Sequence, residues 1–170
     1  MKRKTLLIVL PILALLMVLA GTALAGPPSD RNYLAMLNGD NAGVQTDASG
    51  IAIFHFTPRG TRLGYRLVVN NIENVTMAHI HLADEPGGNG PPVLWLYPDA
   101  PPPQLIDGEF SGVLAERVVT ADDLVGPLAG MTLDDLRQAF DEGLAYVNVH
   151  TMQHPAGEIR GDIGNIGSDQ

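Results

Sequence analysis

The chain has 170 residues, of which 19 are acidic and 10 are basic, so its formal net charge at pH 7 is −9. This acidic balance argues against nucleic acid or an anionic membrane surface as a partner. The chain contains no cysteine, which excludes disulfides, thiolate metal sites and cysteine nucleophiles, so a domain must be held together by its apolar core.

The first 25 residues have the pattern of an export signal. Residues 2–4 are basic, residues 5–20 are apolar apart from Thr5, and residues 23–25 have the small-x-small pattern of a cleavage site. We predict cleavage after Ala25. An uncleaved membrane anchor is the alternative, because the apolar stretch approaches the length of a short span. Without the three basic residues of this segment, seven remain against 19 acidic ones, and the net charge is −12.

The rest of the chain is predicted to form one all-β domain. We expect a linker over residues 26–31, the domain over residues 32–166 and a short tail over residues 167–170. Short apolar or alternating runs are separated by Gly, Pro and Asn turns, which is typical of a β-sandwich or barrel. The predicted strands cover residues 32–37, 50–56, 63–69, 75–82, 93–97, 108–114, 144–151 and 157–163.

One short helix is predicted over residues 132–142. Thr132 and Asp135 have the spacing of a capping box, an apolar stripe follows at positions i, i+3 and i+7, and Gly143 provides a stop. A weaker start signal at residues 120–123 predicts a single helical turn.

Three of the five histidines lie on two predicted strands, in positions where they can share a ligand. Side chains alternate between the faces of a strand, so His79 and His81 share one face, with Cβ atoms about 6–7 Å apart. His150 lies on a second strand, on the face that also carries Tyr146 and Asn148. Three imidazoles with an open coordination position describe a copper or zinc site. The candidate metal ligands are therefore His79, His81 and His150.

A second interpretation of the same residues needs no metal. A buried imidazole can donate a hydrogen bond from one nitrogen and accept one at the other, and partly buried histidines are usually hydrogen-bonded. Asn148, Glu158 and Arg160 would complete such a network. Glu158 and Arg160 share a strand face between two glycines, where we expect a structural clamp. Both interpretations stay open, and the sequence alone favours the network.

The apolar neighbours of these polar residues predict the buried face of the strands. We expect the core to contain Ile80, Leu82, Val147, Val149 and Ile159.

Other residues have simpler interpretations. His55 is expected on the solvent side of its strand, and His154 lies in a loop from which it could reach a nearby metal. Trp95 and Tyr97 share a strand face, and burial is expected rather than an exposed binding stripe. No catalytic residue is assigned, because neither a nucleophile triad nor a nucleotide-binding motif is visible.

Three segments carry a resemblance to a known family. Residues 33–56, 78–96 and 146–163 resemble the signature segments of the CHRD domain, which is named for chordin and is also found as single-domain secreted microbial proteins. The resemblance spans about residues 32–163. It implies an exported Greek-key β-sandwich or partly closed barrel of immunoglobulin-like or superoxide-dismutase-like character.

The segment His79-Ile80-His81 and its glycine-rich loop also resemble the copper-ligand strand of copper–zinc superoxide dismutase. Two features of that enzyme are missing, namely a zinc-binding loop and the two cysteines of its disulfide. We therefore expect a secreted or cell-envelope module with a binding or structural role. Its partner would be an extracellular protein or a small ligand, and neither nucleic acid nor membrane once the signal is removed. The alternative is a copper- or zinc-dependent, dismutase-like redox protein.

Overall fold

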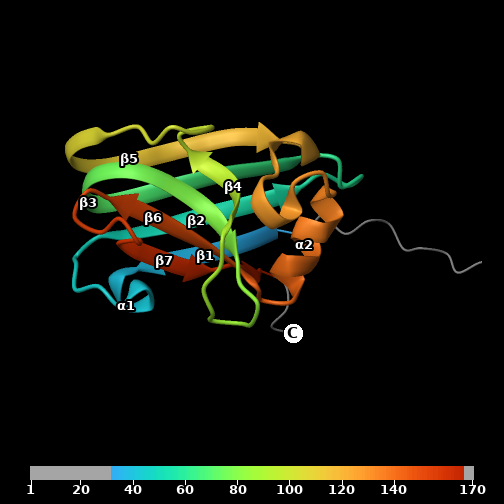
Figure 1. Cartoon of the computed structure of the whole chain (residues 1–170), viewed down its shortest axis with the longest axis horizontal. Helices are drawn as coiled ribbons and strands as arrows, with labels where there is room; N and C mark the ends of the chain where they lie inside the picture. The colour runs from blue at the N-terminus through green and yellow to red at the C-terminus, as the bar shows by residue number, and fades with distance from the viewer. Residues whose placement is uncertain (1–31, 167–170) are drawn as a thin grey trace, which may run out of the picture.

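The computed structural model describes residues 32–166, so the predicted signal segment, linker and tail lie outside the described residues. The all-β prediction is confirmed (Figure 1). The strands are β1 (Asn32–Asn38), β2 (Ser49–Phe56), β3 (Leu63–Leu82), β4 (Pro92–Tyr97), β5 (Ile106–Val119), β6 (Ala145–Thr151), β7 (Ile159–Asp162) and β8 (Gly164–Asn165). The helical elements are α1 (Gly39–Ala42), α2 (Leu133–Asp141) and the 3₁₀ turns η1 (Ala121–Asp123) and η2 (Gly126–Leu128).

Five of the strands close into a barrel. The sheet order is β2-β1-β7-β6-β3, and β2 also pairs with β3, so the last strand meets the first. β4 and β5 pair with β3 outside this ring, and β8 pairs with β1. The sequence left a sandwich and a partly closed barrel as alternatives, and the structure is a closed barrel with additional strands.

β3 organises the barrel because it is one strand of 20 residues, not the two separate strands that the sequence predicts. Asn71 and Asn74 both have a φ of 53°, a backbone conformation that asparagine tolerates better than most residues. Register shifts against β5 occur at the same place, as expected for β-bulges, which bend a strand without ending it. The first half of β3 therefore pairs with β2 and β5, and the second half pairs with β6 and β4.

The helix α2 packs at one end of the barrel (Figure 1). Phe140 on α2 makes edge-to-face contacts with three barrel aromatics at ring-centroid distances of 5.1, 5.4 and 5.6 Å, namely Tyr33, Phe54 and Phe56. Such contacts stabilise a core beyond the burial of apolar area. The predicted helix and its capping box are both confirmed. Within residues 32–166, the helices are too short or too polar to cross a membrane.

The predicted core face of the signature strands is largely confirmed. Ile80, Val147, Val149 and Ile159 are fully buried, whereas Leu82 is half-buried. The alternating residues of β6 point out of the barrel, yet every residue of β6 is buried. The reason is that the loop over residues 83–91 and the turn over residues 152–157 bond to the outward-pointing side chains of β6.

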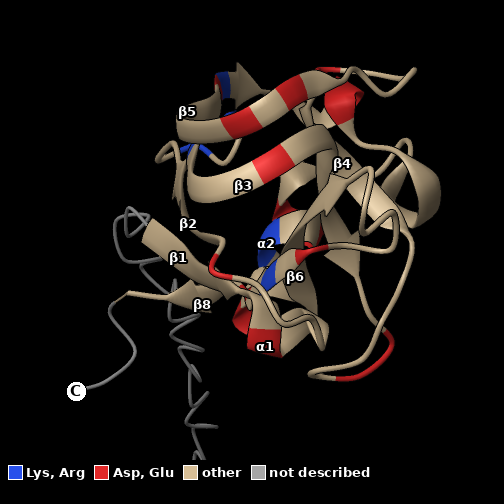
Figure 2. Cartoon of the chain, turned by 90° about the vertical axis from the view of Figure 1, so that its left-hand side faces the viewer, with Lys and Arg blue, Asp and Glu red and all other residues tan. Residues whose placement is uncertain are grey.

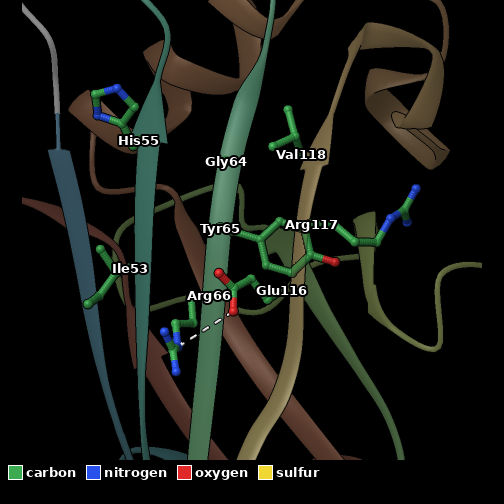
Figure 3. A pocket seen from close by; sticks show the side chains of 8 residues that line it. All are labelled: Ile53, His55, Gly64, Tyr65, Arg66, Glu116, Arg117 and Val118. Atoms are coloured by element: carbon green, nitrogen blue, oxygen red, sulfur yellow. Dashed lines mark ion pairs between the residues drawn. The ribbon is translucent and has the colours of Figure 1, made fainter.

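Elsewhere the outer face of the barrel wall is open to solvent. Gly64 on β3 is in register with His55 on β2 and Val118 on β5. Because Gly64 has no side chain, a shallow groove of about 500 Å³ remains between those of His55 and Val118 (Figure 3). Arg66 and Glu116, which also line this groove, form an exposed ion pair at 3.8 Å. Acidic positions are spread over β3, β5 and α1 (Figure 2).

Candidate metal centre

The three candidate ligands meet on the covered outer face of the barrel. Antiparallel pairing sets His79 opposite Asn148 and Met77 opposite His150, which brings the imidazoles of β3 beside that of β6. One ring nitrogen from each of His79, His81 and His150 lies within 4.8 Å of the other two. The side chains are 4%, 8% and 5% exposed, so the cluster is almost completely shielded from bulk water.

The closest contact joins Nδ1 of His79 to Nε2 of His150, at 3.2 Å. This spacing is that of a hydrogen bond, in which Nδ1 of His79 donates to Nε2 of His150. Two nitrogen ligands each about 2.0–2.1 Å from one ion in a tetrahedral arrangement lie about 3.3–3.4 Å apart, so the spacing is compatible with coordination as well. The third imidazole, that of His81, lies farther away. The bound of 4.8 Å on the distances between the three ring nitrogens exceeds the value of about 4 Å that such a site requires once an ion is bound. A small inward shift of the third ring would close the difference.

Two backbone carbonyls fix which ring nitrogen carries the proton. Nδ1 of His81 donates to the Gly90 carbonyl at 2.8 Å, and Nδ1 of His150 donates to the Pro155 carbonyl at 3.0 Å. A carbonyl oxygen can only accept, so in each neutral ring the proton is on Nδ1 and the lone pair is on Nε2. Carbonyl partners of this kind orient imidazoles that bind metals.

Two imidazole nitrogens of the cluster lack a hydrogen-bond partner. Among the described residues, Nε2 of His79 and Nε2 of His81 are buried and unpaired. A hydrogen-bonded network would be expected to satisfy these atoms, because a buried polar atom without a partner costs about 1–3 kcal/mol. A metal ion would accept the lone pair of His81 without requiring a donor.

Burial keeps the three imidazoles neutral. It lowers the pKa of His79 to about 3 and that of His150 to about 4, and neighbouring imidazoles add to the effect in both cases. Burial also lowers the pKa of His81, against the opposing effect of its bond to Gly90 and assisted by the charge of Arg160. Since only the neutral ring coordinates a metal, the cluster is in its binding form at neutral pH.

Aromatic rings form two walls of the site. The indole of Trp95 on β4 lies edge to face with His79, with a centroid distance of 4.2 Å. On the other side, the ring of Tyr146 stacks on His81 at 5.0 Å, and Cζ of Arg160 lies 3.6 Å from the Tyr146 centroid. The result is a three-layer stack of guanidinium, phenol and imidazole.

Arg160 also holds the loop that covers the site. Its Nη1 donates to Oδ1 of Asn89 at 2.9 Å, and its Nη2 donates to the Gly88 carbonyl at 2.7 Å. The backbone N–H of Gly90 donates to the Tyr146 hydroxyl at 3.1 Å. These contacts position the Gly90 carbonyl that orients His81.

Asn148 and Glu158, the other expected network residues, are bonded to groups other than the imidazoles. Nδ2 of Asn148 donates to the Ala156 carbonyl at 2.9 Å, while its Oδ1 is buried without a partner among the described residues. The Glu158 carboxylate accepts from the hydroxyls of Thr46 and Thr151, both at 2.8 Å. The group that orients His150 is thus a backbone carbonyl and not Glu158.

The two remaining histidines lie outside the cluster. His55 is exposed on β2, as predicted, with Nδ1 2.7 Å from Oδ1 of Asn32. His154 lines a small polar pocket with Glu73 and Glu158.

The roles of Trp95, Tyr146 and the two backbone carbonyls were not predicted from the sequence. Trp95 and Tyr97 are half-buried, so the expected burial is only partial. A proline-containing turn follows each histidine strand, with Gly90 before Pro91 and Pro155 after His154. This shared arrangement was the available signal that the turns fold back onto the imidazoles.

A family model described as the CHRD domain matches residues 33–163. The chain belongs to the CHRD domain family. Comparison with curated proteins and with solved structures gives no significant match. The matched range includes the whole histidine cluster and both turns that contact it, so the candidate metal centre lies within the CHRD domain. These comparisons give no support for the expected likeness to superoxide dismutase around His79 and His81.

Proposed function

We propose that this CHRD domain is an exported binding module that holds one copper or zinc ion through His79, His81 and His150. One observation carries the proposal. Three neutral imidazoles converge in a buried site, and backbone carbonyls fix two of them so that Nε2 presents its lone pair. This arrangement supports coordination over a closed hydrogen-bond network, because Nε2 of His81 has no donor among residues 32–166.

A binding role is supported over the dismutase-like alternative by the burial of the site. Turnover of a small substrate requires an open coordination position that the substrate can reach. Each of the three imidazoles is at least nine-tenths buried, and Trp95 packs against His79 on the side of β4. A bound ion would therefore stabilise the domain, or the domain would serve to retain the ion. A partner, if the module has one, would be an extracellular protein or a small ligand.

The proposed export rests on the basic, apolar and small-x-small pattern of the first 25 residues. Mass spectrometry of material released by the expressing cells should give Gly26 as the first residue. An intact Met1 in a membrane fraction would show that the segment is retained as an anchor.

The metal-binding proposal can be tested on untagged protein that has been freed of metal with a chelator. Elemental analysis should find one equivalent of copper or zinc after reloading, and the melting temperature should rise, because an ion that binds only the folded state stabilises it. His81→Ala should abolish both effects. His55→Ala is the matched control, since it removes an exposed imidazole from another part of the barrel, and it should bind metal like the wild type.

Failure of the wild type to take up metal, or equal uptake by His81→Ala, would contradict the proposal. The cluster would then be a structural network, and the redox alternative would be excluded with it.

A further inference from the structure

The three imidazoles bring no negative charge that would compensate a doubly charged ion. Among residues 32–166, the group of side chains able to share an ion consists of three histidines and includes no carboxylate. Neutral imidazoles contribute no negative charge. A divalent ion bound by these ligands alone would keep its full charge of +2.

The charged group closest to the cluster in the stack is itself a cation. Arg160 lies against Tyr146, which stacks on His81. Two carboxylates lie on or next to β7. Glu158 accepts hydrogen bonds from two threonine hydroxyls, and Asp162 forms an ion pair with Arg160 at 3.2 Å. The charge of Arg160 opposes positive charge near His81, and its ion pair with Asp162 reduces that effect.

Burial increases the effect of charge number. The free energy of moving an ion from water into a medium of low dielectric constant rises with the square of its charge, so a divalent ion incurs about four times the penalty of a monovalent one. Zinc sites with three protein ligands commonly add a water or hydroxide in a fourth position. Here the Trp95 indole packs against His79, which places an apolar, polarizable surface on one side of the cluster.

We infer that the ion selected by this site is monovalent copper, Cu⁺, held by His79, His81 and His150 in preference to Zn²⁺ or Cu²⁺. The inference rests on the metal-binding function proposed above. Cu⁺ accepts three ligands without a hydroxide.

Trp95 is the only tryptophan of the chain and contacts His79, so its fluorescence should report binding of an ion to the imidazoles. Chelator competition would measure the affinities. Metal-free protein would be titrated under anaerobic conditions with Cu⁺ in the presence of ascorbate and a colorimetric Cu⁺ chelator of known affinity. Parallel titrations with Zn²⁺ and with Cu²⁺, without ascorbate, would use matched chelators. We expect one equivalent of Cu⁺ and a Kd about 100-fold or more below those of both divalent ions.

A variant that adds one negative charge tests whether electrostatics cause the preference for Cu⁺. Asn148→Asp places a carboxylate opposite His79 with almost no change in side-chain volume, and it should reduce the preference for Cu⁺ over Zn²⁺ by about tenfold or more. Asn70→Asp is the control, since it adds the same charge at an exposed position on the first half of β3. It should keep the wild-type preference. Melting curves of both variants would establish that they are folded.

The outcomes separate this inference from the proposed function. Tight Cu⁺ binding with weak Zn²⁺ and Cu²⁺ binding supports it, and loss of preference in Asn148→Asp alone supports its electrostatic cause. Equal or tighter binding of a divalent ion to the wild type would overturn the inference and leave the metal-binding function intact. Absence of binding by all three ions would overturn both.

Discussion

The guanidinium of Arg160 lies 3.6 Å from the ring centroid of Tyr146, and the opposite face of that ring stacks on His81. The same guanidinium donates hydrogen bonds to the loop that ends at Gly90. A residue of β7 thus acts on a candidate ligand of β3 in two ways, through the phenol ring and through the loop. The candidate metal centre is therefore coupled to the closure of the barrel between β6 and β7.

This coupling predicts that Arg160→Met destabilises the domain and weakens metal binding. The Asn89 amide oxygen and the Gly88 carbonyl would lose their donor, and the cation–π contact would be lost, so we expect a cost of about 2–3 kcal/mol in the free energy of unfolding. Metal affinity should fall about tenfold or more, as for other residues that orient a ligand. Urea denaturation and metal titration would measure both effects.

Arg66→Met is the matched control for that variant. Its side chain is 53% exposed and its ion pair with Glu116 spans 3.8 Å, so the expected change is below about 1 kcal/mol and metal affinity should be unchanged. Equal costs for the two variants would show that Arg160 does not clamp the loop.

The position of the Gly90 carbonyl predicts that Gly90→Ala is also harmful. A Cβ at Gly90 would overlap the Leu82 carbonyl oxygen, so the backbone would have to move and the bond to His81 would be strained. We expect a loss of about 2–4 kcal/mol in stability together with weaker metal binding. Gly164→Ala, where a Cβ would meet nothing within 4 Å, should be nearly neutral. Thermal melts and metal titrations of the two variants provide the comparison.

Local patterns in the sequence were sufficient to predict most of the fold. Alternation identified the strands, and Thr132 with Asp135 located the helix, because both signals depend on residues close in the chain. The continuity of β3 through Asn71 and Asn74 was not predictable in the same way. Asparagine clusters usually indicate turns, and only pairing with β5 and β6 keeps the chain extended through the two bulges.

The candidate site was predictable in part for the same reason. Placing His79 and His81 on one face required only the period of a strand, and His150 followed from the second signature segment. The contacts that orient the rings come from Gly90, Pro155 and Trp95. These depend on how two turns and β4 fold over the barrel wall, which residue spacing does not encode.

The buried valines of β6 provide a test of how the two faces of the strand are assigned. Val149 is fully buried inside the barrel, so Val149→Asp would place a carboxylate without a partner in the core, at a cost of about 3–5 kcal/mol. Val118→Asp introduces the same residue at a position that is 61% exposed and should change stability by about 0.5 kcal/mol or less. Chemical denaturation should separate the two variants. A Val149→Asp protein that melts within a degree or two of the wild type would reverse the assignment of the faces.

The lowered pKa values of the cluster predict that the metal-free domain loses stability as the pH falls below about 6.5. In the unfolded chain an imidazole has a pKa of 6.5, whereas in the folded domain the pKa is about 3 for His79 and about 4 for His150. Between these values the unfolded state binds more protons than the folded state, so stability is fully present above pH 6.5 and is lost toward pH 4. Each such group contributes a slope of about 1.4 kcal/mol per pH unit.

The contribution of His79 can be isolated by comparing the wild type with His79→Gln. Urea denaturation of both metal-free proteins between pH 7.5 and pH 4.5 would give two stability curves, and the effect of the carboxylates common to both cancels in their difference. At pH 5 the curve of the variant should be less steep by about 1.4 kcal/mol per pH unit, because one proton fewer is taken up on unfolding. Parallel curves would mean that His79 is protonated as readily in the folded domain as in the unfolded chain. The imidazole would then have to be accessible to water, which its burial in the cluster does not allow.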